Sequence, residues 1–284
     1  LMADTHSGAS VVAVDPQAQA ELRNRLAHEE LARAMSPNLT LVSLSGIAYT
    51  VPYHIQVVAK TDSVAERSKI QAIIDHCFHL CDRHLNEFNP KSEVSLINAA
   101  PVGKPVALSP ILTTVLSTAF ALSRMTNGVF DVAVGPLHAH LSDFVKRHGR
   151  MPSSHPGSPE QGAVCEVAKL ATFDASWTLA MGGPTVAVSA PLTGTSATIT
   201  KKHPAARLVL GGISKGYTVD LIIAELERKG GYQHALVSWG GDTRAVGRNH
   251  KEDLWKVGVV VPPSVEQLTQ RGEGGLKKPA AGGG

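Results

Sequence analysis

The segment from Leu208 to Asp220 constrains the fold of this 284-residue chain more than any other. It reads Leu-Val-Leu-Gly-Gly-Ile-Ser-Lys-Gly-Tyr-Thr-Val-Asp, so an apolar stretch typical of a buried strand runs into paired glycines and then into a helical pattern. Lys215 falls in the first turn of that helix, where free backbone N–H groups and an ammonium group favour an anion. The spacing fits neither the P-loop nor the dinucleotide-binding fingerprint. The segment therefore predicts either an anion cradle or glycines that only let a helix pack tightly on a sheet.

Hydrophobic periodicity and cap residues predict helices and strands in a mixed order, which indicates an α+β or α/β fold. Helices are expected over about 16–35, 62–87, 110–126 and 214–229. Strands are expected within 41–58, around a turn near Ser45-Gly46, and over 186–200, 208–210, 234–239 and 255–261. Residues 91–98 read as a loop or a short helix that begins at Ser92, and residues 145–162 as a surface loop.

The chain is expected to form one large domain with tails. Hydrophobic residues make up 43% of it, which is enough for a sizeable core. Residues 1–14 are small and polar and read as a flexible arm, residues 15–263 form the domain, and the Gly-, Pro-, Ala- and Lys-rich residues 264–284 read as a low-complexity tail.

Charge and cysteine content narrow the class of protein. The 27 basic and 24 acidic residues are interspersed, so no nucleic-acid partner is expected. Three cysteines without a disulfide-like spacing favour a reducing compartment. The sequence contains no run of about 18 apolar residues, so no membrane span is predicted. We therefore expect a soluble intracellular protein, cytoplasmic or organellar.

Three shorter segments have the residue types of a site. Cys77, Cys81 and His84 fall on one helical face and could ligate zinc, but both cysteines continue an isoleucine stripe and read as core residues. Asp131 is an isolated acid in a glycine-bounded apolar run, where its partner could be backbone N–H groups, a ligand hydroxyl or a helix N-terminus. Phe88 precedes a proline-containing loop that ends at Asn98, where an aromatic side chain either stacks on a ring or merely packs.

Four segments recur in the right order for one family: the loop around 88–98, residues 128–137, residues 208–220 and residues 239–247. On these motifs the chain resembles the FAD:protein FMN transferases, the ApbE family. The stretches 39–53, 88–96 and 239–242 make it most similar to the N-terminal flavin-transferase domain of protist-type multidomain NADH-dependent fumarate reductases. The resemblance implies an ApbE-like fold of mixed sheets flanked by helices.

The resemblance also implies a mechanism. Mg²⁺ spans the pyrophosphate of FAD, a Ser or Thr hydroxyl of an acceptor protein attacks the FMN phosphorus, and AMP leaves. Catalytic roles are implied for Lys215, which would face FAD, and for Asp131. The Gly212 carbonyl would bind the metal.

The remaining contacts that the resemblance implies are all to the flavin nucleotide. Asp131, Val132 and Ala133 would lie along the dinucleotide, while Phe88 would occupy the place of a stacking tyrosine. Ser45 would stand near the isoalloxazine ring. Val209 stands where the family usually has an acid, so one polar contact is expected to be lost. The late Asp and Thr ligands of the family's magnesium site have no counterpart before Gly284, so the chain is expected to be truncated or divergent.

The N-terminal arm resembles the acceptor segment of the family's target proteins. It reads Asp4-Thr-His-Ser-Gly-Ala-Ser10, so Ser10 would carry FMN through a phosphoester, either in its own molecule or in a neighbouring copy. The plain alternative is a disordered Ser/Gly-rich terminus. Two further functions stay open: an electron-carrier module of a fumarate reductase with covalent FMN, and an inactive domain that keeps only the fold.

Overall fold

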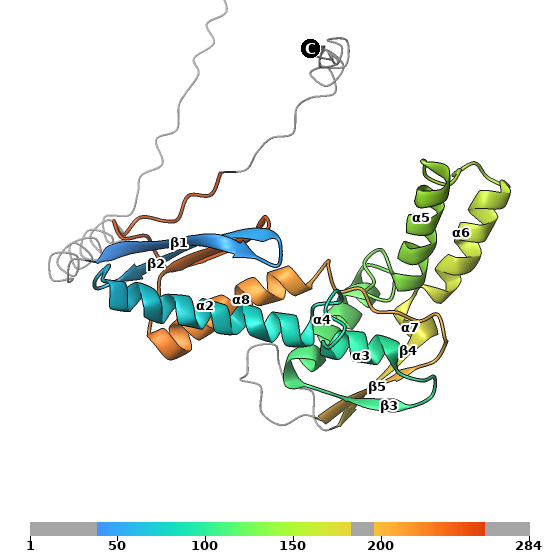
Figure 1. The fold of residues 1–284 in the computed structure, drawn as a ribbon, viewed down its shortest axis with the longest axis horizontal. Helices are drawn as coiled ribbons and strands as arrows, with labels where there is room; N and C mark the ends of the chain where they lie inside the picture. The colour runs from blue at the N-terminus through green and yellow to red at the C-terminus, as the bar shows by residue number, and fades with distance from the viewer. Residues whose placement is uncertain (1–38, 183–195, 259–284) are drawn as a thin grey trace, which may run out of the picture.

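A computed structural model describes residues 39–182 and 196–258 of the chain (Figure 1). These residues form two antiparallel sheets with helices packed around them, and side chains of both sheets belong to one buried apolar core. The α+β expectation is therefore confirmed, with sheets that are antiparallel throughout. The arm with Ser10, the expected helix over 16–35 and the tail over 264–284 lie outside the described residues.

The first sheet has four strands in the order β1-β2-β6-β7. They are β1 (Thr40–Ala48), β2 (Val51–Ala59), β6 (Ala235–Trp239) and β7 (Asp242–Val246). The β1–β2 turn was predicted at Ser45-Gly46 but lies at Tyr49 and Thr50, which both have positive φ. The prediction placed the turn at the glycine. Because the strand pairing runs without a break from Thr40↔Ala59 to Ala48↔Val51, Ser45 lies inside the strand.

Two long helices run along one face of this sheet (Figure 1). They are α2 (Val64–His84) and α8 (Ser214–Gly230), which also pack on each other. Ser63 caps α2 by accepting a hydrogen bond from the Glu66 N–H, and Gly231 ends α8 in the left-handed conformation. Cys77 and Cys81 are buried on the inner side of α2, which confirms their interpretation as core residues.

The second sheet has three strands in the order β3-β5-β4. They are β3 (Pro105–Leu108), β4 (Trp177–Gly182) and β5 (Ser196–Lys201). The short helices α3 (Glu93–Ala99) and α7 (Phe173–Ser176) and the longer α4 (Pro110–Met125) accompany it. Ser92 and Ser109 cap α3 and α4 through their side chains, as their positions in the sequence predict.

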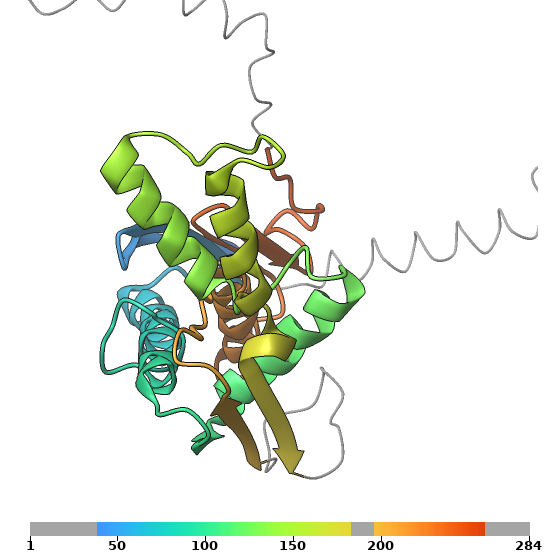
Figure 2. The same cartoon turned by 90° about the vertical axis from the view of Figure 1, so that its right-hand side faces the viewer.

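Two helices stand side by side beyond this core, as Figures 1 and 2 show. They are α5 (Gly135–His148) and α6 (Pro159–Leu170). The sequence predicted a surface loop over 145–162, which is correct only for the middle of that range. The many Pro, Ser and Gly residues there form the end of one helix and the cap of the next, so their composition alone did not reveal the helices.

Two predicted strands are absent from the described residues. Leu208 and Leu210 are fully buried, but residues 208–210 join no sheet. Instead, the Asn98 side chain donates to the Leu208 carbonyl (2.9 Å) and accepts from the Leu208 N–H (2.7 Å), in the place of a neighbouring strand. Of the predicted strand over 255–261, only residues 255–258 are described; they are not a strand, and the indole of Trp255 donates to the Val246 carbonyl. No described helix is long and apolar enough to cross a membrane.

Candidate functional site

The glycine turn, Gly211-Gly212, links a buried extended segment to the start of α8. The segment is fixed on both sides, because the Val209 N–H donates to the Val132 carbonyl (2.8 Å) and Asn98 holds Leu208. The Leu210 carbonyl accepts from the N–H groups of Ile213 and Ser214, both at 2.9 Å. The turn is thus exposed but held by an ordered frame, which suits a site that must keep its shape around a ligand.

Lys215 lies in the first turn of α8, next to the β6–β7 turn of the first sheet. Its Nζ is 3.2 Å from Asp242 Oδ2, and about a third of its side chain is exposed. Gly240 makes room for the lysine: it has a φ of +58°, and a Cβ there would lie 3.4 Å from the lysine Cδ and 2.5 Å from Val51 Cγ1. The chain therefore places a partly exposed cation between the helix N-terminus and the glycine-rich 240–241 turn.

Glu87 is the residue at this site that the sequence did not reveal. It follows α2 in the loop before α3, and a Cβ on Gly211 would lie 3.9 Å from its Oε1. Its Oε2 is buried and has no hydrogen-bond partner among the described residues. Burial raises the pKa of this carboxyl, while Arg207, His138 and the Leu210 N–H act in the opposite direction. No pattern in the sequence marks this acid, because its neighbour Gly211 is distant along the chain.

Asp131 is held by its own chain. Its carboxylate accepts from the Ala133 N–H (2.8 Å), the Ser123 hydroxyl (2.9 Å) and the Phe173 N–H (3.0 Å). It therefore ties the end of α4, the loop before α5 and the start of α7 together. Of the partners that the sequence left open, backbone N–H groups are the main ones found. A contact of Asp131 with a nucleotide stays a prediction.

The other residues predicted to contact the nucleotide differ in how exposed their side chains are. Val132 and Ala133 are buried, so their side chains belong to the core, and Val132 also uses its carbonyl to hold Val209. Phe130 reaches Gly212, where a Cβ would lie 3.3 Å from its ring. Phe88 is 89% exposed, and this leaves its ring free to stack.

Ser45 lies apart from the glycine turn. Successive side chains of β1 point to opposite faces of the sheet, and Val42 faces the core. Because Ser45 lies an odd number of positions from Val42, its side chain points to the face opposite α2 and α8. There it is 2.7 Å from Nδ1 of His54, its cross-strand partner. The structure thus brings Lys215, Gly212 and Glu87 to one end of α8 but does not add Ser45 to them.

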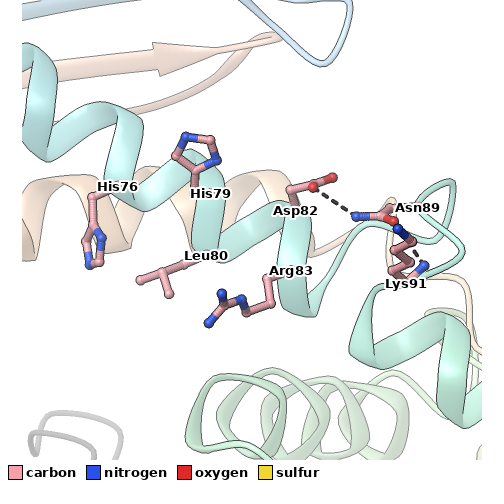
Figure 3. A pocket seen from close by; sticks show the side chains of 7 residues that line it. All are labelled: His76, His79, Leu80, Asp82, Arg83, Asn89 and Lys91. Carbon is pink, nitrogen blue, oxygen red and sulfur yellow. Dashed lines mark hydrogen bonds between the residues drawn. The ribbon is translucent and has the colours of Figure 1, made fainter.

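A pocket of about 460 Å³ lies on the exposed side of α2 and the following loop (Figure 3). Its lining residues are His76, His79, Leu80, Asp82, Arg83, Asn89 and Lys91. The Asp82 carboxylate already accepts from the side chains of Asn89 (2.9 Å) and Asn86 (2.7 Å). The described residues hold no group of three or more His, Cys, Asp or Glu side chains that could bind a metal, so the zinc hypothesis gains no support.

Comparisons with known proteins agree on one family. Residues 49–275 match the family model described as "ApbE family". Over 217 residues the chain is 28% identical to an FAD:protein FMN transferase of Chlamydia pneumoniae, covering 76% of this chain and 60% of that protein. A second such protein, from Haemophilus influenzae, is 26% identical over 223 residues, covering 78% and 59%.

Solved structures show the same fold. The flavin transferase ApbE from Vibrio cholerae is 25% identical, with a TM-score of 0.59, over 81% of this chain and 66% of that one. The apo flavinyl transferase ApbE of Pseudomonas stutzeri is 22% identical, with a TM-score of 0.60, over 78% and 62%. The chain thus spans about three fifths of the length of the curated relatives named above.

Proposed function

Because this chain belongs to the ApbE family, we propose that it transfers the FMN group of FAD to a serine or threonine hydroxyl of a protein. The observation that carries the proposal is the exposed glycine turn with Lys215 beside it, which lies inside the matched residues 49–275. Several relatives that match this chain are named FAD:protein FMN transferases. The site offers what a diphosphate needs: a helix N-terminus and a partly exposed ammonium group.

In the proposed reaction the hydroxyl oxygen of the acceptor forms a bond to the FMN phosphorus. The bond from that phosphorus to the oxygen shared with the AMP phosphate breaks, AMP leaves, and the hydroxyl proton passes to solvent. Negative charge grows on the phosphate oxygens, so oriented donors and cations lower the barrier. Lys215 would balance this charge, and its pairing with Asp242 would keep the ammonium group in place. Phe88 would stack on a ring of the nucleotide.

Magnesium belongs to the same proposal. When bound, Mg²⁺ would supply positive charge to the diphosphate oxygens. It prefers oxygen ligands and usually retains several waters, so one or two protein oxygens beside substrate phosphates are enough. The buried Oε2 of Glu87, which has no partner in the described part of the chain, fits this donor chemistry, as does the Gly212 carbonyl. The residues present therefore suit a magnesium ion at the glycine turn.

Ser10 is the proposed acceptor, and the proposed context is a fumarate reductase-type flavoprotein. The arm sequence Asp4-Thr-His-Ser-Gly-Ala-Ser10 supports this, because small residues around the hydroxyl let it approach a site that already holds FAD. The bound FMN would then carry electrons between other domains of such a protein.

Intact-mass analysis tests the proposal. The chain is incubated with FAD and Mg²⁺, and the mass of one FMN is expected to be added. The Ser10→Ala variant is expected to lack this addition. An adduct that forms only when a separate transferase is supplied would make the chain a substrate and not an enzyme. If no adduct forms in either case, the chain retains only the fold.

A further inference from the structure

The loop after α2 brings a carboxylate to the glycine turn from a distant part of the chain. Glu87 lies beside Gly211 and interacts with the Leu210 N–H, so it contacts the segment that leads into α8. Its backbone is also held, because the Ser95 hydroxyl donates to the Glu87 carbonyl at 3.3 Å. The position of the carboxylate relative to the turn is thus set by contacts on both sides.

One oxygen of this carboxylate lacks a partner. Glu87 Oε2 is buried, and it accepts no hydrogen bond in the described part of the chain. Arg207 and His138 are close enough to influence the carboxyl, yet neither is among the ion pairs formed by residues 39–182 and 196–258. A buried carboxylate oxygen without a donor costs free energy, so it is expected where a ligand completes it.

The backbone carbonyls of the glycine turn also lack backbone hydrogen-bond donors. Of the described backbone N–H groups, none donates to the carbonyl of Gly211 or Gly212, whereas the Leu210 carbonyl accepts from two. Carboxylate and carbonyl oxygens only accept, so two such groups cannot satisfy each other; a hard cation can satisfy both. Lys215 cannot take this role, because its Nζ is directed to Asp242.

We propose that Glu87 is an oxygen ligand of the divalent cation held at the glycine turn. This rests on the proposed function, in which the cation is Mg²⁺ bound together with the FAD diphosphate. An anionic ligand from the protein would let the turn hold the cation before FAD arrives, with water filling the other positions.

Manganese binding to the full 284-residue chain tests the role of Glu87 without any reaction. Mn²⁺ has the same preference for oxygen, and electron paramagnetic resonance measures the free ion directly. Titrations are made with and without ADP, which supplies a diphosphate but no flavin. In the Glu87→Gln variant the affinity for Mn²⁺ is expected to fall about tenfold or more.

The matched control is Glu227→Gln, an exposed glutamate of α8 whose side chain forms no hydrogen bond or ion pair with the described residues; its backbone carbonyl, which accepts from the Gly231 N–H, is unchanged by the substitution. It is expected to bind Mn²⁺ like the unmodified chain. Thermal unfolding in EDTA checks the fold of each variant; glutamine keeps an oxygen for the Leu210 N–H, so little change is expected for Glu87→Gln. If that variant does not fold, Glu87→Asp takes its place, and weakened Mn²⁺ binding at unchanged stability supports the inference.

Unchanged Mn²⁺ affinity in the folded Glu87 variant would overturn the inference, as would an unmodified chain that binds no Mn²⁺ with or without ADP. The FMN adduct measured by intact mass separates this result from the proposed function. An adduct together with unchanged Mn²⁺ binding in Glu87→Gln removes Glu87 as a ligand and leaves the transferase. Mn²⁺ binding that depends on Glu87, without any adduct, leaves the metal ligand and removes the transferase.

Discussion

Two glutamates in neighbouring parts of the molecule have opposite surroundings. Glu93, at the start of α3, accepts from the Ser109 N–H (2.7 Å), the Ser109 hydroxyl (2.6 Å) and Nδ1 of His84 (2.6 Å). Glu87, at the glycine turn, has a buried oxygen with no partner in the described part of the chain. Burial acts on both, but the hydrogen bonds outweigh it at Glu93 and lower its pKa, whereas burial prevails at Glu87 and raises its pKa.

The difference distinguishes a structural acid from one that is ready for a ligand. Glu93 joins α2, α3 and the cap of α4 and has no oxygen left over. Asp131 is of the same kind, because three groups of its own chain donate to it. Glu87 alone of these three retains an unfilled oxygen. How fully a buried acid is hydrogen-bonded is therefore a better guide to its role than its burial.

Alanine substitution is expected to separate the two glutamates most strongly. Glu93→Ala removes three hydrogen bonds from a half-buried cluster and should lower the free energy of unfolding by about 3 kcal/mol. Glu87→Ala should lower it by less than about 1 kcal/mol, because the loss of the Leu210 contact is offset by the loss of an unpaired buried oxygen. Urea unfolding of both variants measures this. Equal costs would mean that Glu87 is structural as well.

Removal of the Lys215 side chain tests whether the nucleotide binds at the glycine turn, where Glu87 lies. Lys215→Ala is expected to weaken FAD binding about 30-fold, or about 2 kcal/mol, since a charged contact to the diphosphate is lost. Fluorescence titration with FAD measures the affinity. Lys229→Ala, at the other end of α8, is the control and should bind FAD normally. An equal affinity for Lys215→Ala would move the nucleotide away from this turn.

Phe88 is expected to contribute less to FAD binding than Lys215 does. Phe88→Ala should weaken FAD binding by about 1 kcal/mol through lost stacking. Because the ring is 89% exposed, the melting temperature should stay the same. Val64→Ala, which trims another exposed apolar side chain, is the control for both measurements. A lower melting temperature with unchanged FAD affinity would show that Phe88 serves the fold instead.

The two glutamates should change the free energy of unfolding in opposite directions as the pH falls, each by less than about 1 kcal/mol. The pKa of Glu93 is lowered from 4.5, so its stabilisation is present above pH 4.5 and is lost as the pH falls through the lower folded-state pKa. The pKa of Glu87 is raised from 4.5, so it costs stability as the pH rises above 4.5. Urea unfolding of the Glu93→Gln and Glu87→Gln variants between pH 3 and 7 measures this. Each variant should lack the contribution of its own glutamate to the slope of unfolding free energy against pH. Slopes of the same sign would contradict the contrast.

Much of the local structure could be predicted because it depends on short-range signals. Ser92 and Ser109 cap helices as their positions indicate, and α8 ends at Gly230-Gly231 as expected. The β1–β2 turn was misplaced because Tyr49 and Thr50 adopt positive φ without any glycine. The 208–210 segment was expected in a sheet, but a single side chain, Asn98, provides its hydrogen bonds. Neither outcome is visible in a local pattern.

The sequence by itself determined a mixed helix-and-strand fold, the glycine turn before α8 and Lys215 in its first turn, because apolar periodicity, caps and glycine pairs act over a few residues. It left α+β and α/β both open, and the antiparallel pairing of the folded chain decided for α+β. Only the tertiary structure decided which acid meets that turn. Asp131, in a conspicuous motif, is satisfied by Ser123, Ala133 and Phe173, whereas Glu87 reaches Gly211 across more than a hundred positions of the chain. The hydrogen bonds and burial that separate these acids arise from long-range packing, which residue spacing does not encode.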